Sequence, residues 1–526
     1  MVEISAIDSL ETAAGPSRPD GTGEDRRPLR DVVFSGRFFS QRHEESTQAL
    51  AAFLHGGVSS WDALRVWFGD GLGHILGRGR DALLAALDRD IAAIDAALSL
   101  QLDAILHSPR LLLFEGRWRG LAWLISGIEP GRRVKVRLLP IRWPELSRDL
   151  ERALEFDQSI TFKRIYEEEF GMPGGEPFGL MVIDHGLRHR SGPDTTTDDV
   201  GTLGRLSAVA AAAFMPVVLS LDPSVLDVGE FSDLDGVRDV IAPLRDTEHM
   251  RWRTIASRPD VRFMAVTLPR LLARHPWTDD PSRCDGFRYR EYAPDTGCRV
   301  WMNAGYAFAA CAVRAFAENG WPADVRGVEV DRVGGGLVTN LPPEPLASGP
   351  PFQWPRSAIE YNFSARQEQS LVEVGMMPVT SLPFGPDMVF GAVRSMQAPS
   401  SYTGTNAAAA QANARLSAQV NSMLCASRFA HLLKVMGRDM VGSYKTSDEI
   451  ERQLNNWLQN YVNTNIDNTT ASRARYPLVE GEVQVRERAG KPGSFGCVIR
   501  LRPHYQLDDV STTFHFVTEI RAPGQR

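Results

Sequence analysis

One apolar stretch of the chain is followed by side chains of the types that perform acid–base or metal chemistry. Residues 180–183 (Leu-Met-Val-Ile) predict a buried strand, with Asp184 and His185 at its end and His189 four residues further on. A carboxylate beside an imidazole can transfer protons or bind a metal ion, and α/β proteins place such groups where strands end. No nucleophile motif or H-E-x-x-H sequence accompanies them. Catalysis by Asp184 and His185 is therefore the weaker hypothesis.

A second group of polar side chains surrounds a tryptophan. Glu115, Arg117 and Arg119 flank Trp118, an arrangement suited to ion pairs and to guanidinium stacking on the indole ring. Such a charged cluster either stabilises one fold or joins domains or subunits. Because charge pairs are common where helices begin, we favour a salt-bridge cluster within one fold.

Helices and strands that would position these groups alternate along the chain. Apolar residues recur every three or four positions between 87 and 105, which predicts a helix that ends before Ser108 and Pro109. Residues 134–139 alternate as a strand does, and helices and strands then follow one another between 199 and 268. This pattern predicts an α/β (α+β mixed) fold with several layers.

The C-terminal region predicts a helix followed by a three-strand meander. Thr446 lies three residues before Glu449 and forms a capping box that begins the helix. The strands are predicted at 478–486, 495–502 and 511–520. Apolar side chains alternate strongly in the last one, so it must pair, either within its own sheet or with a neighbour's edge. The candidate assembly residues are Phe514, Phe516, Val517 and Ile520.

The composition excludes several classes of function. The 526-residue chain has a net charge of −7, which gives no support for binding to DNA or RNA, because nucleic-acid-binding proteins typically carry basic patches. Its five cysteines include no C-x-x-C pair, which argues against a zinc site and a disulfide framework. Residues 1–31 lack the order of a signal peptide, and the apolar run 208–219 is too short to span a bilayer. We predict a cytoplasmic protein that is not inserted in a membrane and has no metal or cofactor.

We divide the chain into five segments. They are a disordered tail (1–30), a helical N-terminal region (31–130), an α/β domain (131–345), a second part of the core with long helices (346–475) and a C-terminal β-meander and arm (476–526).

Several stretches resemble the large subunit of the type VI secretion contractile sheath, the TssC/VipB family. The matching stretches are 101–106 with 114–121, 165–171 with 174–177, 267–270, 303–309, 327–329 with 335–337, 413–417, 428–431 with 434–436, and 501–508. They occur in the family's order over roughly residues 85 to 522. The family's N-terminal arm and unfoldase-recognition helix have no clear counterpart in residues 1–80.

The resemblance implies a structural protein without catalytic residues and with a fold similar to phage tail sheath proteins. Its implied partners are a small sheath subunit (TssB-type), further copies of itself in stacked hexameric rings, an inner tube protein, a baseplate and an AAA+ unfoldase. Terminal strands are exchanged between protomers in this family. The alternatives are a soluble α/β enzyme that uses Asp184 and His185, and a sheath protein of another phage-tail-like contractile apparatus.

Overall fold

The computed structural model divides the chain into two compact units. The first contains residues 1–104 and 278–290, and the second contains residues 105–277 and 291–526. The structure describes residues 28–34, 53–54, 59–131, 133–172, 174–192, 196–280, 282, 286–328, 333–342, 357–383, 385–399, 410–411, 414–415, 417–440, 446–463, 475–487, 495–503 and 514–520.

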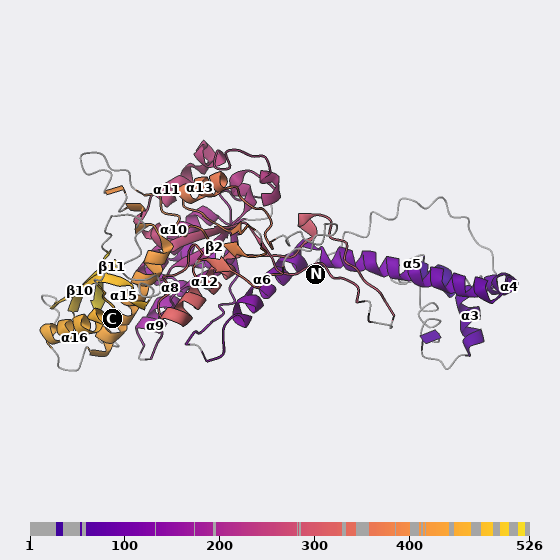
Figure 1. The fold of residues 1–526 in the computed structure, drawn as a ribbon, viewed down its shortest axis with the longest axis horizontal. Helices are drawn as coiled ribbons and strands as arrows, with labels where there is room; N and C mark the ends of the chain where they lie inside the picture. Colours follow the sequence, from indigo (N-terminus) through magenta and orange to yellow (C-terminus); the bar gives the residue numbers. More distant parts are fainter. Residues whose placement is uncertain are drawn as a thin grey trace. The chain divides into compact units, whose positions relative to one another are not determined.

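The regular secondary structure described in the first unit is helical. Its helices are α1 (Leu29–Phe34), α3 (Ser60–Phe68), α4 (Gly71–Leu76) and most of α5 (Arg80–Leu106), the long helix in Figure 1. Phe68, Leu72 and Ala86 form a small buried core. No helix in the described part of the chain is both long and apolar enough to cross a membrane.

The first described helix begins earlier than predicted. The predicted tail, residues 1–30, includes Leu29 and Arg30, which lie in α1, whereas residues 1–27 fall outside the described residues. Arg30 Nε donates to Asp90 Oδ2 at 2.7 Å, and Trp67 Nε1 donates to the same oxygen at 2.9 Å. Because Asp90 is 4% exposed, these two bonds satisfy a buried carboxylate, and they attach α1 (through Arg30) and α3 (through Trp67) to α5.

A parallel four-stranded sheet forms the centre of the second unit. The strand order is β1 (Met181–Leu187), β2 (Val217–Leu221), β3 (Met264–Leu268) and β7 (Met377–Pro378). Val218 pairs with Val182 on one side and Ala265 on the other. The alternating elements therefore build the mixed α/β layers that the sequence predicts.

Helices cover both faces of this sheet. Val217 and Leu219 of β2 join a core with Leu203 and Leu206 of α10 (Asp199–Ala212). Val218 points the other way and joins Phe308 of α12 (Ala304–Asn319), so α10 and α12 lie on opposite sides, as Figure 1 shows. Since both faces are buried, every residue of β2 is buried, which is typical of a parallel strand.

Further helices and strands complete the second unit. The helices and turns are α6 (Pro109–Ser126), α7 (Trp143–Arg152), α8 (Ile160–Phe162), a π-helical turn (Lys163–Glu167), α9 (Glu168–Phe170), α11 (Met250–Ala256), α13 (Ala365–Glu373), α15 (Val420–Met440) and α16 (Ser447–Gln459). The strands are β4 (Leu271–Leu272) paired with β5 (Trp301–Met302), and β6 (Leu337–Val338), β9 (Met388–Val389) and β8 (Thr380–Ser381) in one sheet.

Two glycines allow α6 to pack closely in the second unit. A Cβ at Gly116 would lie 2.0 Å from the carbonyl oxygen of Trp301, and one at Gly120 would lie 2.6 Å from the Tyr306 ring. Both glycines are buried. This close approach places α6 in the α/β unit, although the sequence groups it with the helical region of residues 31–130.

One predicted strand is wrong. Residues 134–139 have no regular secondary structure, and Val136, Leu138 and Leu139 are exposed. Alternation of side chains makes a strand only when a neighbouring strand satisfies its backbone, and no described strand pairs with this segment.

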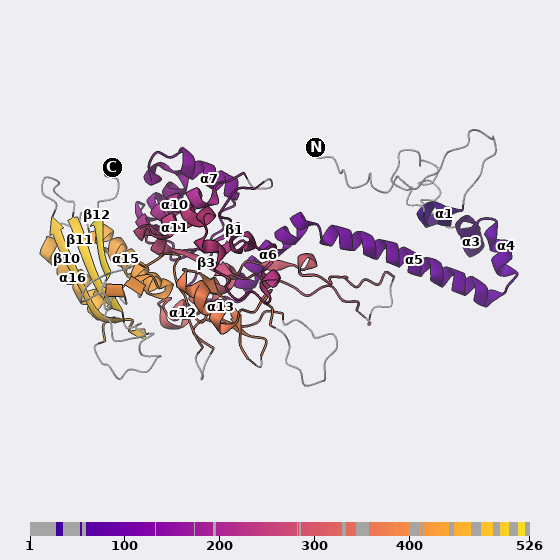
Figure 2. The same cartoon turned by 90° about the horizontal axis from the view of Figure 1, so that it is seen from above.

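The C-terminal sheet and helices follow the prediction closely. β10 (Leu478–Glu487), β11 (Phe495–Pro503) and β12 (Phe514–Ile520) form an antiparallel sheet in that order. α16 begins with the capping box of Thr446 and Glu449. These strands and α16 lie together in Figure 2.

A neutral histidine on the buried side of α15 lies in the core. His431 is 1% exposed, and its Nε2 lies 2.9 Å from the carbonyl oxygen of Ala213. Because a carbonyl only accepts, Nε2 carries the proton, and Nδ1 has no partner among the described residues. Burial lowers the pKa of His431 to about 4.

We expect this histidine to make the stability of the second unit depend on pH. Its folded pKa of about 4 lies below the ordinary value of 6.5, so its contribution is complete above pH 6.5 and decreases as the pH falls towards 4. The complete loss of this contribution lowers the free energy of unfolding by about 3 kcal/mol. In urea unfolding between pH 7 and 4, His431→Gln should lose this component of the pH dependence, whereas the exposed His74→Gln should retain it. Equal slopes for all three proteins would contradict the assignment.

Candidate functional site

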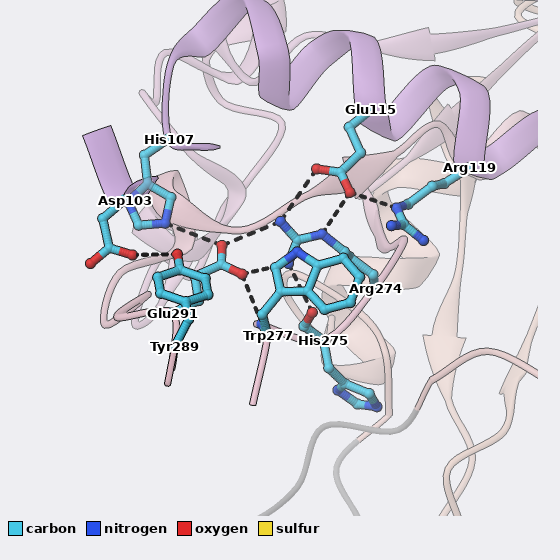
Figure 3. Close-up of polar contacts among 9 residues, drawn as sticks. All are labelled: Asp103, His107, Glu115, Arg119, Arg274, His275, Trp277, Tyr289 and Glu291. Carbon is cyan, nitrogen blue, oxygen red and sulfur yellow. Dashed lines mark hydrogen bonds and ion pairs between the residues drawn. The ribbon is translucent and has the colours of Figure 1, made fainter. Parts of the chain in front are cut away.

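The charged cluster on α6 is part of a buried ion-pair network. Arg274 Nε donates to Glu115 Oε1 at 2.7 Å, and its Nη1 donates to Glu291 Oε2 at 2.6 Å. Arg119 Nε also donates to Glu115 Oε1 at 2.7 Å. His107 Nε2 lies 3.2 Å from Glu291 Oε1 (Figure 3). Two carboxylates therefore surround one guanidinium that is 7% exposed.

The network favours the ionised form of Glu115 despite its partial burial. Burial opposes ionisation of Glu115, but hydrogen bonds from Arg274 and Arg119 outweigh it and hold the pKa of Glu115 below its ordinary value. The Glu291 side chain is 1% exposed and also accepts from the backbone N–H of Trp277 at 2.8 Å. The Arg274 guanidinium lies 5.4 Å from the centre of the Trp277 ring.

The other half of the predicted cluster faces outward. Trp118 is 51% exposed and meets Phe114 edge-on, with ring centres 6.2 Å apart. Arg117 Nε lies 3.9 Å from Asp184 Oδ2, and its side chain is 45% exposed. The structure thus brings Glu115 and Arg119 together, and it places the aromatic contact of Trp118 on Phe114 rather than on a guanidinium.

Asp184 and His185 do not form one site. They lie inside β1 rather than at its end, and neighbouring residues of a strand point to opposite faces. Asp184 Oδ2 accepts from the Tyr306 hydroxyl at 2.9 Å on the α12 side. His185 Nε2 lies 2.8 Å from Asp199 Oδ2 on the α10 side. The pairing that the enzyme hypothesis requires is wrong.

Each of these side chains has a structural partner. The His185 ring stacks on Trp143 with centroids 4.2 Å apart, and burial raises the pKa of Asp184 beside Tyr306. His189, the third member of the predicted group, stacks on His249 at 4.0 Å. The three side chains belong to three separate packing contacts rather than to one reaction centre.

The C-terminal sheet has two edges with different surroundings. β10 is one edge strand, and side chains of α16 bind its outward backbone groups: Asn455 Oδ1 accepts from Val483 N at 2.8 Å. β12 is the other edge strand, and no described strand pairs with its outer side. The predicted terminal strand thus pairs with β11 of its own chain.

The pairing register shows which β12 backbone groups point outward. Because the Val483 backbone faces α16, its opposite residue Ile499 must direct its own backbone groups towards β12, where it faces Phe516. The neighbouring positions, His515, Val517 and Glu519, therefore direct their backbone N–H and C=O groups away from β11. Outward backbone groups that no described strand bonds are a template for strand addition.

Comparison with known proteins identifies the family. Residues 88–397 match the VipB family model, described as EvpB/VC_A0108, tail sheath N-terminal domain. Residues 409–520 match a second model, described as EvpB/VC_A0108, tail sheath gpW/gp25-like domain. The type VI secretion system sheath protein TssC1 of Pseudomonas aeruginosa is 33% identical over 442 residues, which are 83% of this chain and 86% of the relative.

The chain belongs to the TssC/VipB family of sheath proteins. This confirms the resemblance, the α/β tail-sheath fold and the function of a structural sheath subunit that the sequence predicts. The family match begins at residue 88, which agrees with the unmatched N-terminal region. α6 and β10–β12 of this sheath protein both lie inside the matched ranges.

Sequence reasoning missed the centre of the ion-pair network in this sheath protein. Arg274 lies 159 residues from Glu115 and 17 residues from Glu291, so no helical or strand spacing connects them. One signal is available in the sequence. Arg274 follows the apolar pair Leu271 and Leu272 closely, and a cation next to a buried strand needs an acidic partner.

Removal of Arg274 should destabilise the second unit strongly. The variant Arg274→Met leaves Glu115 and Glu291 without their shared cation, and an uncompensated buried charge costs about 3 to 5 kcal/mol. Arg119→Met removes a partner that is 38% exposed, so it should cost about 1 kcal/mol or less.

Urea unfolding at pH 7 measures both changes. The double variant Arg274→Met with Glu291→Gln also removes one of the two carboxylates that Arg274 binds. It should therefore recover part of the lost free energy of unfolding. Equal destabilisation by Arg274→Met and Arg119→Met would show that the network contributes no more than a surface ion pair.

Proposed function

We propose that this chain is the large subunit of a cytoplasmic type VI secretion sheath. It pairs with a small sheath subunit, and the heterodimers stack as hexameric rings around an inner tube. Contraction of the sheath then propels the tube. The observation that carries this proposal is the match to both tail sheath domains over residues 88–397 and 409–520.

The protein acts in this role through its surfaces and not through catalysis. Asp184 and His185, the acid and base of the enzyme alternative, face opposite sides of the central sheet and have structural partners there. The baseplate and an AAA+ unfoldase are further partners that the family resemblance implies.

The outer edge of β12 is the proposed connection between protomers. Backbone groups of His515, Val517 and Glu519 point away from β11 and can bond an added strand of a neighbour. A ladder of backbone bonds tolerates rigid-body rotation of the two protomers when the linkers bend, which a contracting lattice requires. Phe514, Phe516, Val517 and Ile520 remain the candidate residues of this connection.

A proline at Val517 tests the connection. Proline removes the outward N–H at this position, and an edge strand tolerates proline when that N–H faces solvent. We expect Val517→Pro to keep its pairing with the small subunit but to form no hollow tubules in negative-stain electron microscopy after co-expression. Val517→Thr keeps the N–H and should form tubules like the unchanged chain.

Two other results have clear meanings. Tubules from Val517→Pro would refute the connection through β12 and leave the sheath function intact. Discrete particles from the unchanged chain with its small subunit would refute the sheath assembly itself.

A further inference from the structure

The β10 edge of the C-terminal sheet is covered by a ladder of polar side chains. α16 runs along the β10 side of the sheet (Figure 2). Glu451 Oε2 accepts from Val485 N at 2.8 Å, and Asn455 bonds both backbone groups of Val483, with Nδ2 donating to the carbonyl at 2.7 Å. Gln459 Nε2 donates to the carbonyl oxygen of Gly481 at 3.1 Å.

The spacing of the ladder follows from the rise per residue of the α-helix and of the β-strand. The three side chains lie four residues apart on α16, and their targets lie two residues apart on β10. Four residues of α-helix advance about 6.0 Å, and two residues of strand advance about 6.6 Å. Because these distances nearly match, the same side-chain geometry repeats three times, and consecutive outward groups of the strand are bonded.

The helix is held against the strand by an apolar row beside the polar one. Ile450, Leu454 and Leu458 are buried, and each precedes one ladder residue by a single position. A Cβ at Gly481 would lie 2.8 Å from Leu458 Cδ2, so this glycine allows the helix to approach closely. One row of α16 therefore packs on the face of the sheet while the next row covers its edge.

We propose that α16 is an edge guard that prevents β10 from accepting a strand. The occupant it excludes is the β10 edge of a second copy of this chain, whose outward backbone groups would otherwise be complementary. Strands then join this sheet only on its β12 side. The consequence for the lattice rests on the proposed function, whereas closure of the β10 edge does not.

Hydrogen exchange tests the ladder one amide at a time. The measurement uses the complex with the small subunit. Glu451→Ala should speed hydrogen exchange of the Val485 amide about tenfold, and Asn455→Ala should speed exchange of the Val483 amide by a similar factor. Gln459→Ala should change neither, because Gln459 donates to a carbonyl. Glu451→Gln keeps an acceptor and should restore protection of Val485, and Asn456→Ala, an exposed neighbour, is the matched control. Unchanged exchange of both amides would refute the ladder.

Self-association tests the guard. The triple variant Glu451→Ala, Asn455→Ala, Gln459→Ala is compared with the unchanged sequence by sedimentation, both carrying Val517→Pro to remove strand addition at β12. We expect the triple variant to form dimers and larger species. Adding Val483→Pro removes an outward N–H from β10 and should reverse this association.

Two sedimentation results would overturn the guard. The triple variant could remain as dispersed as its reference, or it could associate equally with and without Val483→Pro. Neither measurement requires a sheath, so failure of tubule formation and failure of the guard are separate outcomes.

Discussion

The need of every strand edge for hydrogen-bond partners is the constraint on which this structure depends. The central parallel sheet has helices on both faces, so its interior strands are buried and offer no surface to a neighbour. The C-terminal sheet solves the same problem differently. Its β10 edge is bonded by side chains of α16, and its β12 edge retains outward backbone groups. Within the C-terminal sheet, as far as the structure describes it, the backbone available for strand addition therefore lies on the β12 side.

The helix α6 has one side that is held by buried ion pairs and another side that is exposed. Glu115 and Arg119 are four residues apart and share the side that meets Arg274. Phe114 and Trp118, also four apart, share an exposed side. A buried network with matched charges holds one arrangement firmly, because each partner is costly to remove. The exposed side has no buried ion pairs to break. Of these two sides, it is therefore the one that suits contacts that change partners during contraction.

Local patterns allowed much of the fold to be predicted from the sequence. The end of α5 just before Ser108 and Pro109, the capping box of α16 and the alternation in the terminal strand each depend on residues close in sequence. The strand predicted at residues 134–139 failed because alternation does not supply a neighbour. The pairing of Asp184 with His185 failed because a strand separates adjacent side chains. Arg274 was missed because tertiary structure alone joins it to Glu115 and Glu291.

A sheet that accepts a strand at only one of its two edges has a consequence for any lattice built by strand addition. If both edges accepted strands, a subunit could join two neighbours in either order, and copies of the chain could also pair with each other through their β10 edges. Side chains that satisfy one edge remove that choice without adding a strand. The constraint comes from α16 itself, since its apolar row fixes the helix and its polar row completes the backbone bonds. Direction in the assembly can therefore be encoded within the subunit, before any partner binds.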